Sequence, residues 1–379
     1  METKIKYNSF AFVLVFFLYS LTTLPGNYIN QGALTIGLSS LLLLPWVLYN
    51  VIKPIYREIY VAIAFELILF IILLIEILIY PRYEKGIFDA ILYLLSIGTI
   101  GLIIGCFKID VDTVYKYGSF LAYICAVTSC LFLLTTGEDL MDVSMRFGYA
   151  LLPSVLWFLM MFFKKKSLIQ LLLFFCFLLP LLIWGSRGAI LVVLIFLFLT
   201  VIKGKKIFLL VIPFFLVFYS NILDLLSNAM MSLFELTGAE KIMGMISIMT
   251  GEGEKAIGGR DNLYMHCINL IKENPMGNGV SFWMYDPEME GSFPHNVFLH
   301  IGCEFGIIGI IFIITIFILA LIKTLRSNSD DFLINNYLFS IAIGRLLVSS
   351  MYWARPEFWL FISYFLFKSH KKYKSRIIN

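Results

Sequence analysis

Three short polar motifs interrupt an otherwise apolar sequence, and each contains a side chain suited to phosphate or proton chemistry. The first is Gly185-Ser186-Arg187-Gly188, which lies between two apolar runs. We expect the chain to turn here, which places Arg187 at the N-terminus of the following helix. The free N–H groups of a helix N-terminus attract an anion, and a guanidinium binds phosphate oxygens through two parallel hydrogen bonds. Anchoring of the turn at a membrane interface is the alternative role for Arg187.

The second motif, Gly258-Gly259-Arg260, repeats this design. Asp261 follows it and is a suitable N-cap residue, so we expect Arg260 to lie beside the start of a short amphipathic helix that ends before Pro275. No Gly-Lys-Ser or Gly-Lys-Thr follows the glycines at the spacing of a P-loop, which argues against nucleotide binding. The alternative for Arg260 is a solvated loop charge paired with Asp261.

The third motif, Pro294-His295-Asn296, precedes a long apolar run. The dipole of the following helix disfavours the imidazolium form, so we expect His295 to be neutral at pH 7 and able to accept a proton. A histidine at the membrane interface without a catalytic role is the alternative. His300 lies about 140° further around the helix, so a metal site shared by the two histidines is not expected, whereas His300 and Glu304 are four residues apart and can pair.

A few charged residues fall inside apolar runs, where charge is costly and often functional. Arg345 lies late in one run, close to Arg355, and Glu66 lies in another. Together with Asn296, these are candidate substrate-binding residues. A structural ion pair is an equal alternative for each of the charged ones.

These residues indicate one reaction. Fixed arginines hold a diphosphate and stabilise it as a leaving group, and a neutral histidine takes a proton from an attacking hydroxyl. This combination suits glycosyl transfer from a lipid-diphosphate sugar donor, and we expect it to need neither a metal nor another cofactor.

The composition shows which elements must position these residues. Hydrophobic residues make up 60% of the 379 residues and charged residues only 14%, so lipid rather than water must surround much of the chain. The net charge of +4 does not indicate nucleic-acid binding. We predict an all-α, polytopic membrane protein that forms a single domain over residues 1–379. About twelve spans are expected, near residues 10–24, 32–50, 58–79, 87–107, 115–134, 147–163, 167–184, 189–202, 207–223, 295–322, 332–349 and 352–367.

The distribution of Lys and Arg predicts the orientation. If the N-terminus is inside, the inner segments contain nineteen of these residues and the short outer loops contain five. Both termini are therefore expected in the cytoplasm, and the first apolar run is interpreted as a span rather than a signal peptide. The long connection 224–294, between the predicted ninth and tenth spans, is expected on the outer side, together with all three polar motifs.

The order and spacing of the motifs resemble those of the O-antigen ligase and O-antigen polymerase superfamily. The resemblance covers residues 168–322 and rests on Ser186-Arg187-Gly188, Gly258-Gly259-Arg260, Asn274-Pro275 with Gly277 and Gly279, and His295-Asn296 with Gly306 and Gly309. The first half of the chain is similar only in being apolar and multi-spanning.

The resemblance implies a metal-independent glycosyltransferase of the bacterial plasma membrane that acts on undecaprenyl-diphosphate-linked oligosaccharides at the outer face. Arg187 and Arg260 match the diphosphate-binding arginines of the family, and His295 matches its proposed general base. We predict an O-antigen or capsular polysaccharide polymerase, with membrane lipid, a chain-length regulator and a flippase as partners. The alternatives are an O-antigen ligase that moves polymer onto lipid A–core, a lipid-linked glycan flippase, and a structural or regulatory membrane protein.

Overall fold

Helices make up the part of the chain that the structure, a computed structural model, describes, and no strand occurs in that part. It describes residues 2–23, 31–52, 57–135, 140–184, 187–204, 228, 231–232, 258–289, 291–348 and 351–368. Within these ranges, side chains are described except those of residues 31–33, 133–135, 140–145, 183–184, 187 and 258–261. The predicted all-α class is confirmed for the described residues.

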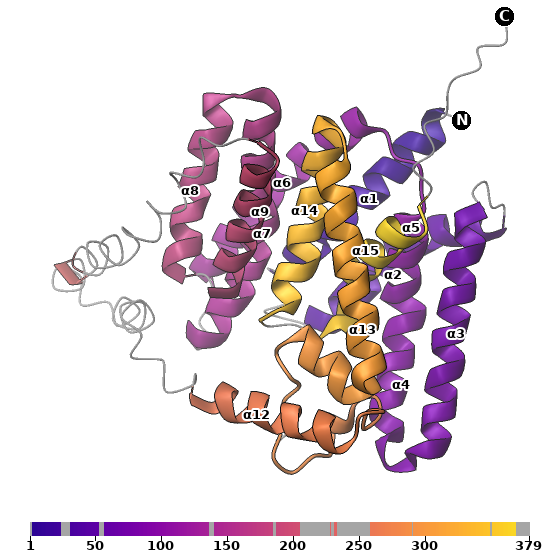
Figure 1. Ribbon diagram of the computed structural model, residues 1–379. Coiled ribbons are helices and arrows are strands. Elements are labelled where there is room, and N and C mark those ends of the chain that lie inside the picture. The colour runs from indigo at the N-terminus through magenta and orange to yellow at the C-terminus, as the bar shows by residue number, and fades with distance from the viewer. Residues whose placement is uncertain are drawn as a thin grey trace, which may run out of the picture.

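The helices follow the apolar runs of the sequence. In chain order they are α1 (Glu2–Thr23), α2 (Gln31–Ile52), α3 (Arg57–Ile79), η2 (Pro81–Tyr83), α4 (Glu84–Tyr93), η3 (Leu94–Gly98), α5 (Thr99–Gly105), α6 (Val111–Thr135), α7 (Leu140–Lys165), α8 (Leu168–Trp184), α9 (Arg187–Ile202), α12 (Gly258–Glu273), η6 (Phe282–Met284), α13 (Val297–Arg326), α14 (Ser329–Leu346), η7 (Tyr352–Ala354) and α15 (Pro356–Leu366) (Figure 1). Each predicted span except one coincides with helices of this series. The exception, 207–223, lies outside the described residues.

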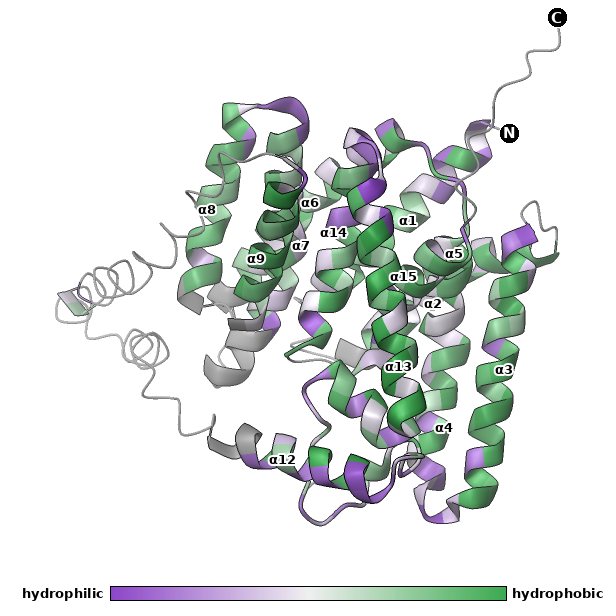
Figure 2. Ribbon diagram, viewed as in Figure 1, coloured by the Kyte–Doolittle hydropathy of each residue, from purple (hydrophilic) through white to green (hydrophobic). Residues whose placement is uncertain are grey.

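Among the described residues, six helical segments are long and apolar enough to cross a bilayer: Glu2–Thr23, Leu34–Ile52, Arg57–Ile79, Pro81–Gly105, Arg146–Lys165 and Val297–Arg326. Hydrophobic residues predominate along the helices of the bundle (Figure 2), and many of their large side chains are exposed. Leu78 on α3 is 79% exposed and Ile308 on α13 is 64% exposed, which water would not tolerate over so wide a surface. The chain is therefore a membrane protein, whereas the count of twelve spans stays a prediction.

The core forms around α1, which packs against α2, α5, α6 and α7. Aromatic rings join it to the later helices: the Phe17 ring lies 5.9 Å from Trp157 of α7, which lies 5.0 Å from Tyr337 of α14. Close packing of α15 on α5 depends on a small residue, because a Cβ at Gly101 would lie 2.5 Å from the carbonyl oxygen of Pro356. These contacts fix the positions of α14 and α15 relative to the N-terminal helices.

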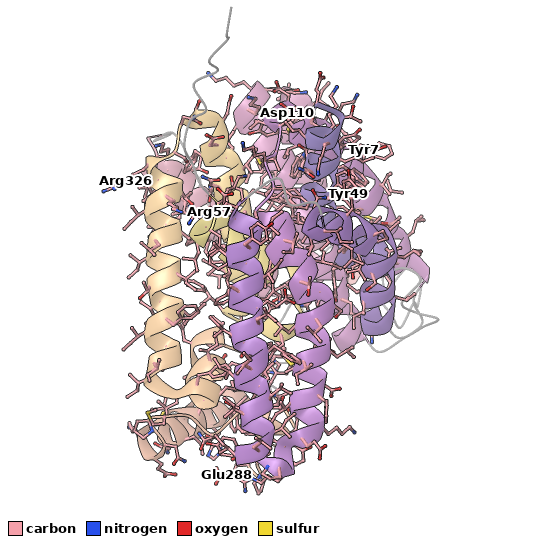
Figure 3. The ribbon with its side chains drawn as sticks, turned by 90° about the vertical axis from the view of Figure 1, so that its right-hand side faces the viewer. Tyr7, Tyr49, Arg57, Asp110, Glu288 and Arg326 are labelled. Carbon is pink, nitrogen blue, oxygen red and sulfur yellow. The ribbon has the colours of Figure 1, made fainter. Side chains whose placement is uncertain are left out.

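The amphipathic helix α12 lies across one end of the bundle, below α13 (Figure 1). We call this the α12 end. Figure 3 shows Glu288 at this end and Asp110 at the opposite one. Following the chain through the bundle, α9 and α13 run away from the α12 end, and α14 runs back toward it. The helix predicted after Arg260 is confirmed, but its predicted N-cap is wrong: α12 begins at Gly258, so Asp261 lies inside its first turn.

The segment after α12 is joined to α13 at a break in that helix. Gly306 has φ 66° and ψ −156°, a conformation that interrupts the helix and is open to glycine. The N–H of Ile307 donates to the carbonyl oxygen of Pro275 at 2.9 Å. A Cβ at Gly306 would lie 2.0 Å from that same oxygen. Two residues of the family resemblance, Pro275 and Gly306, thus form one structural joint.

The same joint explains two more glycines. Gly277 and Gly279 have φ of 98° and 92°, and a Cβ at Gly277 would lie 2.3 Å from the carbonyl oxygen of Glu304. The N–H of Gly279 donates to this oxygen at 3.2 Å, and the N–H of Asn278 donates to the carbonyl oxygen of Cys303 at 2.7 Å. The joint therefore fixes α12 and the start of α13 as one unit at the α12 end.

Candidate functional site

The start of α9 lies against α7 and the end of α14. A Cβ at Gly188 would lie 2.1 Å from the Tyr149 hydroxyl oxygen and 2.5 Å from a methyl carbon of Val348. Glycine at this position therefore lets the first turn of α9 approach both neighbours. The backbone of Arg187 opens this turn, as the sequence predicts, and its N–H groups are among those that a helix leaves unpaired at its N-terminus.

Beside this turn, two arginines lie in an aromatic setting that we call the cationic cluster: Tyr19, Tyr149, Arg345, Arg355 and Glu357. The Arg345 guanidinium carbon lies 4.2 Å from the centroid of the Tyr19 ring and 4.4 Å from that of Tyr149. The Arg355 guanidinium carbon lies 5.1 Å from the Tyr19 centroid. Glu357 approaches Arg345 at 3.6 Å.

The cationic cluster has more positive than negative charge among its described side chains, with two guanidinium groups and one carboxylate. Arg345 is only 5% exposed, so water screens little of its charge. Two buried polar atoms at the cluster, the Tyr149 hydroxyl oxygen and Arg355 Nε, have no hydrogen-bond partner among the described residues. Buried donors of this kind are normally satisfied, and an anionic ligand would supply acceptors for both.

His295 lies near the end of α14, to which the next residue in the chain is hydrogen-bonded. It directly precedes Asn296, the N-cap of α13, whose side-chain oxygen accepts from the N–H of Phe298 at 2.9 Å. The Asn296 side-chain nitrogen donates to the carbonyl oxygen of Leu347 at 3.3 Å, two residues beyond Arg345. The His295 ring packs against Phe293, with 4.5 Å between centroids. The cap therefore positions the histidine beside the end of α14, and it gives Asn296 a structural role.

A second buried group surrounds Glu304, which is 1% exposed. Its carboxylate accepts from the N–H of Ser281 at 3.0 Å, from the Trp353 indole at 3.1 Å and from the Tyr352 hydroxyl. His300 Nε2 lies 3.2 Å from the same carboxylate, so the predicted pairing is confirmed. The contacts with Tyr352 and Trp353 fix the segment that directly precedes Arg355, and they therefore help to position this arginine in the cationic cluster.

The predicted site residues do not all meet. The start of α9, Arg345, Arg355 and His295–Asn296 gather around the end of α14. The side chains of Arg187 and Arg260 lie outside the described residues, so only their backbone positions in the first turns of α9 and α12 are known. Glu66 lies on α3, on the other side of the bundle from α9, where the Thr99 hydroxyl donates to it.

Sequence reasoning missed Tyr19 and Tyr149. Each is one tyrosine in an apolar helix, and a tyrosine there ordinarily marks packing or an interface. Only the cation–π contacts with the two arginines distinguish them. Among the described residues, no group of three or more His, Cys, Asp or Glu side chains could hold a metal ion.

The comparison with known families now adds a second line of evidence. Residues 172–314 match the family model for O-antigen ligase. The match confirms the resemblance seen in the sequence. The matched region includes the starts of α9 and α12 and the start of α13, whereas Arg345 and Arg355 follow it. No curated protein and no solved structure gave a significant match.

Proposed function

We propose that this protein is a glycosyltransferase that polymerises a surface polysaccharide. The donor is a glycan on a polyprenyl diphosphate, and the acceptor is a sugar hydroxyl of another lipid-linked repeat unit. The observation that carries the proposal is the gathering of the start of α9, the cationic cluster and His295 around one end of α14. The match to the O-antigen ligase family supports the same donor chemistry.

The charges of the site suit a diphosphate leaving group. The acceptor hydroxyl gives its proton to His295 while its oxygen attacks the anomeric carbon of the donor. The bond from that carbon to the phosphate oxygen breaks, and the polyprenyl diphosphate leaves with the electron pair. Arg345 and Arg355, with the N–H groups of the first turn of α9, stabilise the charge that develops on the leaving oxygen.

Arg187 and Arg260 are assigned to the same diphosphate. Arg187 is the first residue of α9, and Arg260 lies in the first turn of α12. Each matches an arginine of the family resemblance. We place the α12 end outside a bacterial plasma membrane, because the distribution of Lys and Arg favours this orientation. A chain-length regulator and a flippase are the expected partners.

A ligase reaction is the alternative, and the name of the matching family, O-antigen ligase, supports it. Ligase and polymerase use the same donor and differ in the acceptor. Deletion of the gene, followed by electrophoresis of surface glycan, separates them. Single repeat units on the final anchor are expected for a polymerase, whereas long polymer retained on the lipid carrier would identify a ligase.

A variant of the proposed base tests the enzymatic role directly. His295→Ala should insert normally and abolish glycan extension by the purified protein in liposomes. His266→Ala is the matched control, because His266 lies on α12 between Asp286 and Glu288, at 3.0 and 2.9 Å. A flippase would instead lose translocation of the lipid-linked repeat in the His295 variant, and normal extension by that variant would refute the proposal.

A further inference from the structure

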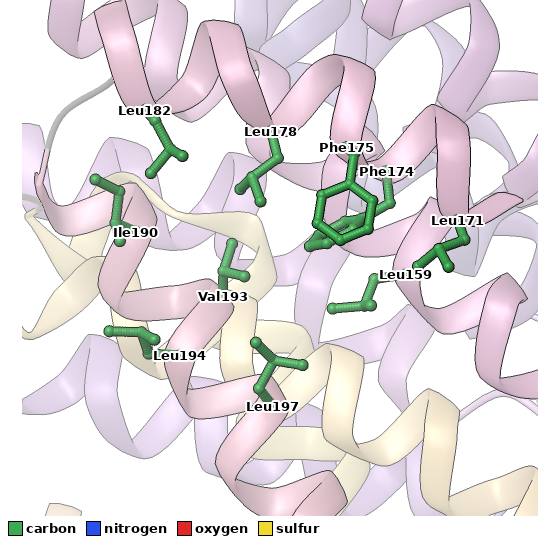
Figure 4. A pocket seen from close by; sticks show the side chains of 10 residues that line it. All are labelled: Leu159, Leu171, Phe174, Phe175, Leu178, Leu182, Ile190, Val193, Leu194 and Leu197. Atoms are coloured by element: carbon green, nitrogen blue, oxygen red, sulfur yellow. The ribbon is translucent and has the colours of Figure 1, made fainter. Parts of the chain in front are cut away.

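An apolar groove lies between α7, α8 and α9 (Figure 4). Every described residue that lines it is aliphatic or aromatic, including Leu159 on α7, Leu178 on α8 and Val193 on α9. About 500 Å³ of space not filled by atoms lies along the groove, and this volume includes space that is open to the surroundings. The helices α8 and α9 are adjacent in sequence, yet over this length their side chains leave a gap between them.

The groove differs from the outer, lipid-facing surface of the same helices. Leu178 and Val193, which line it, are 3% and 4% exposed. Their neighbours Leu179 and Phe198, which do not line it, are 47% and 56% exposed. The lining side chains point into the gap from both helices (Figure 4). The groove is therefore walled by buried side chains of α7, α8 and α9, and it opens to the exterior beside Phe175, which also lines it and is 43% exposed.

One end of the groove reaches the candidate site. Ile190 lines the groove and lies within the first turn of α9, two residues after Gly188. At Gly188 this turn meets Tyr149, whose ring contacts Arg345. A wholly apolar channel thus leads to a helix N-terminus, an unsatisfied buried hydroxyl and a cationic cluster. This order, from apolar side chains to polar and cationic groups, suits a ligand with an apolar chain and an anionic head group.

We propose that this groove holds the isoprenoid chain of the lipid-diphosphate donor. The diphosphate group of the donor, which leaves from the anomeric carbon, then lies at the start of α9. The proposal rests on the proposed function for the identity of the head group. Bilayer tails are as apolar as leucine side chains, so the groove provides packing and orientation rather than extra hydrophobic gain. Orientation matters because a small displacement of a reacting group slows transfer strongly.

Photolabelling tests the groove without requiring transfer. The probes are a polyprenyl diphosphate with a diazirine on its chain and a phosphatidylglycerol with the same group. In wild-type protein in liposomes, the polyprenyl probe should label peptides within residues 168–204. Leu178→Trp fills the groove and should reduce this labelling about tenfold, whereas the neighbouring Leu179→Trp, on the lipid-facing side, should leave it unchanged.

Three results would overturn the proposal. Equal labelling by phosphatidylglycerol would identify an ordinary bilayer lipid. Absent labelling in the wild type would mean that another part of the polypeptide fills the groove. Equal labelling in both variants would place the isoprenoid chain elsewhere. Val193→Phe, on the opposite wall, serves if Leu178→Trp does not fold.

Kinetics separates this proposal from the proposed function. With donors of short and full-length chains, Leu178→Trp should raise KM for the long donor about tenfold and leave the short donor unaffected. Labelling of the groove without any glycan transfer would reject the glycosyltransferase and retain the lipid site. Transfer that ignores chain length in the wild type would reject the lipid site alone.

Discussion

Among single residues, Arg345 combines burial with several close contacts. It lies between two tyrosine rings and 3.6 Å from Glu357, with almost no exposure. Removing one partner of a buried pair leaves the other charge without compensation, which costs more than the pair contributes. Stability and ligand binding are therefore linked at this position, and a useful test must separate them.

Arg345→Ala should lower the free energy of unfolding by about 3 kcal/mol, because Glu357 is left as a buried charge. The double variant Arg345→Ala/Glu357→Gln should recover most of that stability. Glycan transfer should stay at least about a hundredfold below wild type in both, because the cation for the leaving group is gone. Thermal unfolding in detergent and transfer in liposomes provide the two measurements, and transfer that recovers with stability would contradict a role in binding.

Tyr149→Phe removes a buried hydroxyl that has no partner among the described residues, so stability should change by less than about 0.5 kcal/mol. Transfer should fall about tenfold, because a hydrogen bond to a charged ligand is lost. The matched control is Tyr337→Phe, whose hydroxyl donates to the carbonyl oxygen of Pro153 at 3.0 Å. That control should lose about 1 kcal/mol of stability and keep its activity; the reverse pattern would remove Tyr149 from the site.

The sequence indicated the arginines and the histidine because charge and helix-start chemistry are visible in single motifs. It could not indicate Tyr19 and Tyr149, because their role depends on contact between α1, α7 and α14. Asn296 illustrates the opposite limit: its type suggests substrate binding, but its side chain caps α13 and bonds Leu347.

At the level of elements, the break in α13 decides how the α12 end is assembled. The sequence reads as one apolar run there, and hydropathy does not reveal a helix interruption. The spacing of the glycines was the available signal. Their role in the helix break becomes clear only from the contact with the backbone carbonyl of Pro275. Similarly, the last predicted span begins at 352, whereas α15 begins at Pro356, because proline suits the first turn of a helix.

Gly306→Ala should destabilise the protein by about 3 kcal/mol or more, because the new Cβ meets the Pro275 oxygen and the residue has positive φ. Gly291→Ala is the matched control, since Gly291 also has positive φ but has nothing within 4 Å of an added Cβ. It should lose only about 1 kcal/mol. Thermal unfolding in detergent measures both, and equal losses would show that the joint tolerates the added carbon.

At the level of the whole molecule, the sidedness of the bundle decides whether the site meets an exported glycan. Most helices and their order followed from hydropathy, because a 20-residue apolar run has few alternatives to a span. The distribution of Lys and Arg adds a direction, which labelling from the two sides of the membrane tests.

Single cysteines placed at the two ends in a cysteine-free background test the orientation. Glu288→Cys should react with a membrane-impermeant maleimide added to intact cells, and Asp110→Cys should react only after permeabilisation. Figure 3 shows the two positions at opposite ends, and both side chains are exposed. The opposite labelling pattern would place the candidate site in the cytoplasm and end the proposal for an exported substrate.

The length of α15 has a consequence for the lipid itself. Its 11 residues span about 16 Å, roughly half of the ~30 Å hydrocarbon layer. With the end of α15 at the cytoplasmic interface, as the distribution of Lys and Arg predicts, Arg355 at its start would lie well beneath the plane of the outer phospholipid head groups. A carrier bound there would have to draw its phosphates down into the membrane, so bilayer thickness becomes a variable of the reaction and thinner lipids should favour it.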